Sequence, residues 1–91
     1  MAEPRSEPLP PPDFLRYLQG YVTQVLIHLG EVENPLEDKR TVRLDLAKYS
    51  IDLLELIRQK TRGNLTPEEE KFLGGALYDL RLRFVARSTQ A

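Results

Sequence analysis

The chain has 91 residues, with 13 Lys or Arg, 14 Asp or Glu and a formal net charge of -1 at pH 7. This length allows one small domain, and the balanced charge argues against a polycation built for nucleic acid or anionic lipid. The absence of cysteine excludes disulfides, thiolate metal sites and thiol nucleophiles, as suits a reducing cytoplasm.

Residues 1–12 contain five of the seven prolines. Proline has a fixed φ and no amide hydrogen, so this segment is predicted to be a disordered, solvated tail. Its Pro8-Leu9-Pro10-Pro11 stretch would fit a polyproline-binding groove, but such short matches are common by chance. The segment also lacks the apolar run of a signal peptide, and we expect no secretion by that route.

The first helix is predicted over residues 14–29, with Asp13 as its N-cap and Gly30 as its left-handed end. Residues 17–30 carry no charged side chain, yet a membrane span needs about 20 apolar residues. We therefore reject a membrane span and expect protein to cover this helix.

His28, the only histidine, lies in the last turn of this helix. No carboxylate lies one or two turns away on the same helix to complete a metal site or to orient a general base. A packed or carbonyl-capping side chain is the favoured interpretation, and we predict no catalytic residue, no metal and no cofactor.

A connector follows over residues 31–43, with its turn at Asn34-Pro35. The brief apolar alternation after Val42 would fit a short strand, but a helix over residues 44–62, ended by Gly63, is preferred. This second helix is apolar over more than half its circumference, which predicts packing on more than one neighbour. Its narrow polar face consists of Asp45, Lys48, Asp52, Glu55 and Gln59, with Lys48 and Asp52 at ion-pair spacing.

The third helix is predicted over residues 67–87. Thr66-Pro67-Glu68-Glu69 has the pattern of a capping box with proline at the first helical position. The helix carries two apolar seams. One is expected in the core and contains Leu73, Ala76, Leu77, Leu80 and Phe84, whereas the other contains Gly75, Tyr78, Leu82 and Val85.

The spare apolar faces predict self-association. Each helix of a three-helix monomer needs one apolar stripe, and all three helices here have more apolar surface than one stripe. We therefore predict a homodimer or higher homo-oligomer. An obligate partner of different sequence is the alternative. Gly20 and the Gly74-Gly75 pair lie within these helices, where glycine lowers helix stability. They would allow the backbone of another helix to approach closely, and simple helix irregularity is the alternative explanation. The predicted interface residues are Tyr17, Gly20, Tyr21, Ile27, Leu56, Gly75, Tyr78, Leu82 and Val85.

Basic residues support a different function, nucleic-acid binding, if the ends of the second and third helices lie together. Stabilisation of the helix C-termini explains the same charges without a ligand. The sequence contains no phosphate loop, nucleophile elbow or dinucleotide fingerprint, so an enzyme with a site between subunits ranks last. The basic residues are Arg58, Lys60, Arg62, Arg81, Arg83 and Arg87.

Several segments resemble a family of small bacterial proteins known as domain of unknown function 1844 (DUF1844). They are HLG at 28–30, NP at 34–35, IDLL at 51–54 and KTRGNLT at 60–66. The resemblance covers about residues 14–86 and implies a helical bacterial cytoplasmic protein with no established activity. The chain departs from the family at Leu36-Glu37-Asp38 and at Arg43, where a capping Asn or Asp is expected.

The sequence thus predicts an all-α protein, a three-helix bundle or helical hairpin over residues 13–87 that dimerises. The tail at 1–12 and the terminus at 88–91 are predicted to be disordered. The leading function is a non-enzymatic self-associating interaction or scaffold module in the cytoplasm, with no membrane partner.

Overall fold

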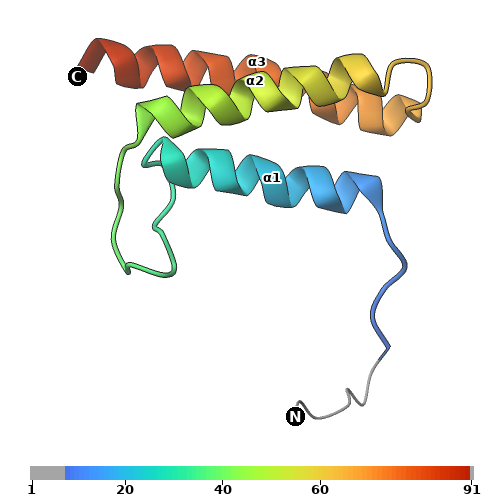
Figure 1. Cartoon of the computed structure of the whole chain (residues 1–91), viewed down its shortest axis with the longest axis horizontal. Coiled ribbons are helices and arrows are strands. Elements are labelled where there is room, and N and C mark those ends of the chain that lie inside the picture. The colour runs from blue at the N-terminus through green and yellow to red at the C-terminus, as the bar shows by residue number, and fades with distance from the viewer. Residues whose placement is uncertain (1–7, 91) are drawn as a thin grey trace.

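The computed structural model describes residues 8–90, which form three helices and no strand (Figure 1). α1 spans Phe14–His28, α2 spans Leu44–Lys60 and α3 spans Pro67–Gln90. Each helix packs against the other two, so the predicted all-α class is confirmed. α2 runs opposite to both α1 and α3, and the 31–43 connector extends on the side of α1 (Figure 1).

The core lies along the common axis of the three helices. No polar or charged side chain among residues 8–90 is buried, which fits a core assembled from one apolar stripe per helix. The core seam predicted for the third helix supplies three of the buried side chains. The buried set is Leu18, Val25, Leu29, Ala47, Ile51, Leu54, Leu73, Leu77 and Leu80.

The helix starts follow local hydrogen bonding. Asp13 Oδ2 accepts from the Arg16 amide at 3.0 Å, which confirms the predicted N-cap of α1. The capping box of α3 is also formed, because the Glu69 amide donates to Thr66 Oγ1 at 3.1 Å and the Thr66 amide donates to Glu69 Oε1 at 2.9 Å. α2 begins after Arg43, which makes no side-chain cap and instead pairs with Asp45 at 3.0 Å.

The helix ends differ from the predicted bounds. α1 ends one residue early and α2 two residues early, whereas α3 continues three residues past Arg87 to Gln90. Residues 88–90 are therefore helical rather than disordered, because no glycine or proline follows Arg87 to stop the helix. The Ser88 and Thr89 hydroxyls also donate to carbonyls of the preceding turn, at 2.9 and 3.0 Å.

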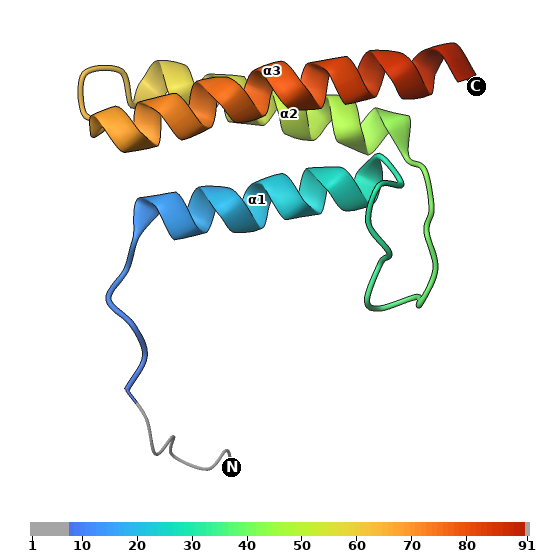
Figure 2. The same ribbon diagram turned by 180° about the vertical axis from the view of Figure 1, so that it is seen from behind.

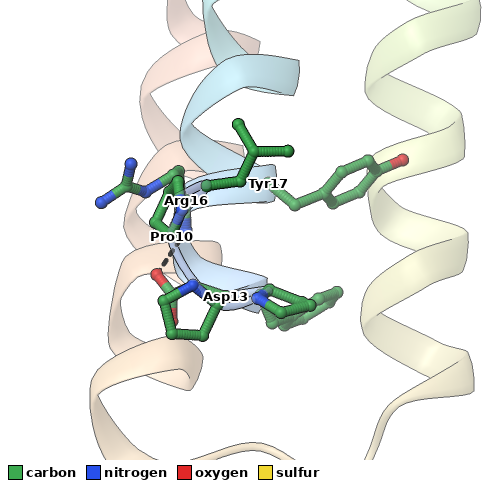
Figure 3. Close-up of a pocket in the computed structure, with 8 residues that line it drawn as sticks. Pro10, Asp13, Arg16 and Tyr17 are labelled. Carbon is green, nitrogen blue, oxygen red and sulfur yellow. Dashed lines mark hydrogen bonds between the residues drawn. The ribbon is translucent and has the colours of Figure 1, made fainter. Parts of the chain in front are cut away.

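The predicted tail falls partly outside the described residues. Residues 1–7 and Ala91 lie outside them, and residues 8–12 are exposed and without regular secondary structure. A shallow hollow of about 670 Å³ lies where residues 9–12 meet the first turn of α1 (Figure 3). Phe14 and Tyr17 border it with stacked rings, whose centroids are 6.2 Å apart.

Candidate protein-interaction surface

One face of α3 is apolar and exposed along three helical turns. Tyr78, Leu82 and Val85 are 69%, 54% and 57% exposed, although all are large apolar residues. With the exposed Gly75 they are spaced three, four and three residues apart, so they share one face. We call these four residues the α3 ridge. In Figure 2, α3 lies in front and no other ribbon crosses it.

A groove of about 420 Å³ separates part of the α3 ridge from α2. Arg58 of α2 and Gly74 of α3 both line it. A Cβ at Gly74 would lie 3.4 Å from the Arg58 guanidinium, so this glycine leaves room for an arginine of the same chain. A Cβ at Gly75 would have no neighbour within 4 Å. Of these two glycines, Gly75 is therefore the one with free space beside it for another molecule.

Paired charges flank the α3 ridge on both sides. Arg81 Nη2 bonds to Glu55 Oε1 of α2 at 2.8 Å, and this bond holds the pKa of the Glu55 carboxyl below its ordinary value. On the other flank, Arg83 Nε bonds to Asp79 Oδ2 at 2.7 Å. The apolar strip thus runs between two ion pairs that are already satisfied within the protomer.

A second apolar cluster comes from α1 and α2. The half-buried Tyr21 donates its hydroxyl to the Ser50 carbonyl at 3.1 Å, and burial raises the pKa of Tyr21. Tyr17 and Tyr49 lie close enough to raise this pKa further. Tyr17 points from α1 toward the side of α2 (Figure 3). Tyr49 is 64% exposed and was missed as a surface residue, since the sequence pattern included it in the broad apolar face of α2.

The structure divides the nine predicted interface residues among separate places. Gly75, Tyr78, Leu82 and Val85 form the α3 ridge, whereas Tyr17, Tyr21 and Leu56 belong to α1 and α2. Gly20 is exposed, with no atom within 4 Å of a Cβ built on it. Ile27 is half-buried and borders a small cavity with residues of the connector.

The six predicted basic residues are divided too. Arg83 Nη1 and Arg87 Nε both bond to Glu31, at 3.3 and 3.1 Å, and Arg87 also donates to the Gly30 carbonyl. Arg58 lies beside Gly74, about 20 Å along α3 from Arg87 at 1.5 Å per residue. Lys60 and Arg62 belong to the far end of α2 and its loop. The guanidinium groups therefore do not form one basic surface.

Glu31 was not identified by sequence reasoning. It follows the glycine that ends α1, and its partners on α3 are 52 and 56 residues away in sequence. The only sequence signal was an acidic residue next to the end of a helix, and this signal does not indicate which basic residues it binds.

His28 is half-buried and takes part in the fold through its backbone. Its carbonyl accepts from the Arg43 amide at 2.7 Å, which ties the end of α1 to the start of α2. Among residues 8–90, no group of three or more His, Asp or Glu side chains is placed to hold a metal ion. None of the described helices is both long and apolar enough to cross a membrane.

Comparison with known proteins gives one match. The family model described as "Domain of unknown function (DUF1844)" matches residues 11–86, which is most of the chain and includes all of α1 and α2 and most of α3. No curated protein and no solved structure matches the chain.

Proposed function

The chain belongs to the DUF1844 family, which carries no assigned activity, and from its exposed surface we propose that it is a non-enzymatic interaction module that associates with itself. The family match covers all of α1 and α2, most of α3 and the whole α3 ridge. A bacterial origin and a cytoplasmic location, which the family resemblance implies, are part of this proposal.

The exposure of the α3 ridge is the observation that carries the proposal. Full burial of a large apolar side chain contributes roughly 1.5–3 kcal/mol, and in the protomer more than half of Tyr78, Leu82 and Val85 remains in water. Contiguous exposed apolar residues on small soluble proteins mark interaction surfaces. A second copy is the most common partner for such a surface, because two-fold homodimers are the most frequent oligomers.

RNA binding through the arginines has weaker support. Arg81, Arg83 and Arg87 each bond to a carboxylate of the same chain, so phosphate would have to displace Glu55, Asp79 or Glu31. Binding of a nucleic-acid backbone favours several uncompensated cations on one surface. The half of the basic set that lies on α3 does not meet this requirement.

The mass of the full chain in solution tests the proposal. We expect light scattering at micromolar concentration to give a dimer or larger species, and Leu82→Glu to give a monomer because a charge would be buried in the interface. Thr23→Glu, at an exposed position on α1, is the matched control and should keep the wild-type mass.

A monomeric wild-type chain would contradict self-association. Capture experiments from the native cell extract then identify what replaces it: one recurring protein would indicate a partner of different sequence, and recovered RNA would favour nucleic-acid binding.

A further inference from the structure

We infer that the α3 ridges of two copies pack against each other in antiparallel orientation. The two-fold axis crosses the α3 ridge at the level of residue 80 along the helix, so that Val85 of each copy lies over Gly75 of the other. This inference rests on the proposed self-association and adds its orientation and register. It commits the exposed face of α3 to a second copy of the same chain.

The spacing of the α3 ridge supports a helix-to-helix seam. Intervals of three, four and three residues place Gly75, Tyr78, Leu82 and Val85 in one nearly straight line, as in the core positions of a coiled coil. One step further at the same spacing, the line ends in exposed polar residues, Lys71 on one side and Thr89 on the other. The apolar strip is thus limited to the length of four layers.

Side-chain size favours the antiparallel register. A two-fold axis near Leu80 sets Gly75 against Val85 and Tyr78 against Leu82, so each layer combines a larger with a smaller residue. Gly75 has no atom within 4 Å of its Cβ position, which leaves space for an incoming valine. A parallel pair would set Gly75 against Gly75 and Tyr78 against Tyr78, leaving a void beside two bulky rings. Interfaces pack without such voids.

The charges of α3 point to the same orientation. Residues 67–78 contain three glutamates and one lysine, net -2, whereas residues 79–90 contain one aspartate and three arginines, net +2. A parallel pair would bring two acidic first turns together, and an antiparallel pair separates them while opposing the helix dipoles. The charges nearest the axis, Asp79 and Arg81, are already paired with Arg83 and Glu55. The antiparallel seam therefore adds no unpaired charge at its centre.

Disulfide trapping tests the register directly, because the natural chain has no cysteine. Gly75→Cys and Val85→Cys are made as single variants, oxidised separately and as an equal mixture, and analysed on non-reducing gels. We expect the mixture to give at least ten times more covalent dimer than either variant alone, since only the Gly75–Val85 pair brings the two sulfur atoms within bonding reach. A mixture of Thr23→Cys with Val85→Cys is the control and should give only background.

Two results would overturn the inference: homodimeric cross-links from each single variant, which indicate parallel pairing, or no cross-link in the mixture. The mass of each reduced variant, measured first by light scattering, separates the two proposals. A reduced dimer that gives no mixed disulfide rejects this register and leaves self-association standing. A reduced monomer of both variants and of the wild type rejects both.

Discussion

At the scale of single residues, the two glycines that follow the ends of α1 and α2 differ in what surrounds them. Both have positive φ, +77° at Gly30 and +87° at Gly63. A Cβ at Gly30 would lie 2.6 Å from Val42 Cγ2, whereas a Cβ at Gly63 would meet no atom within 4 Å. Gly63→Ala therefore tests backbone strain alone, whereas Gly30→Ala tests backbone strain together with steric overlap against Val42.

We expect Gly63→Ala to lower the free energy of unfolding by about 1 kcal/mol, from the left-handed backbone alone. Gly30→Ala should cost a further 1–3 kcal/mol, roughly the cost of overpacking, because Val42 and the connector that carries it must shift away from the added Cβ. Urea denaturation of the two variants measures both. Equal losses of unfolding free energy in the two variants would show that the connector moves away from the added Cβ at no cost.

The hydroxyl of Thr66 has a local role that can be isolated. We expect Thr66→Ala to lower the free energy of unfolding by about 1 kcal/mol, because the Glu69 amide loses its acceptor at the start of α3. Thr23→Ala is the control: its hydroxyl bonds to the Gln19 carbonyl in mid-helix, and its loss should change stability by less than about 0.5 kcal/mol. An unchanged Thr66→Ala variant would mean that the cap adds nothing to the folded chain.

Glu55 gives a prediction about pH. Its pKa is lower in the folded chain than its ordinary 4.5, owing first to the bond from Arg81. The carboxylate therefore adds stability above the unfolded pKa, and that stability is lost as pH falls through the folded pKa. Melting curves of the wild type and Glu55→Gln should differ most near neutral pH and converge in acid. A constant difference across this range would count against the Arg81 pair.

At the scale of elements, Glu31 joins the end of α1 to the last turns of α3. Its carboxylate bonds to both Arg83 and Arg87, and these side chains are only partly exposed. These bonds therefore hold the first residue of the connector and the C-terminal part of α3 together.

We expect Glu31→Ala to lower the free energy of unfolding by about 1 kcal/mol, the upper range for partly exposed pairs. Amide hydrogen exchange should quicken at residues 84–90 and at the start of the connector, because both lose the same anchor. Glu33→Ala, two residues away and exposed, is the control with no expected change. Faster exchange throughout all three helices would instead indicate general destabilisation.

At the scale of the whole molecule, self-association should link stability to concentration. If folded copies associate and unfolded ones do not, raising the protein concentration raises the melting temperature. We expect an increase of a few degrees for each tenfold rise, as about 1 kcal/mol shifts a domain of this size by roughly 4–8 °C. Leu82→Glu should remove this dependence while retaining helical circular dichroism. If the melting temperature of Leu82→Glu still rose with protein concentration, the interface would lie elsewhere.

Several features of the fold were predictable from the chain because their causes lie within a few residues. The cap at Asp13, the box at Thr66 and the positive φ of Gly30 and Gly63 each depend on a residue type and its nearest backbone. The core seam of α3 likewise follows from helical periodicity, which places its members on one face. Helix ends were less predictable, since α3 continues past Arg87 where no strong stop signal occurs.

The sequence by itself determined the three helices, the N-terminal caps of α1 and α3 and which seam of α3 is spare, because these depend on interactions within one or two helical turns. Only the tertiary structure decided that the spare residues fall into separate surfaces and that Arg81 and Arg87 face Glu55 and Glu31, which are 26 and 56 residues away. Periodicity fixes the face on which a side chain lies, but its neighbour on another helix depends on how the helices pack together.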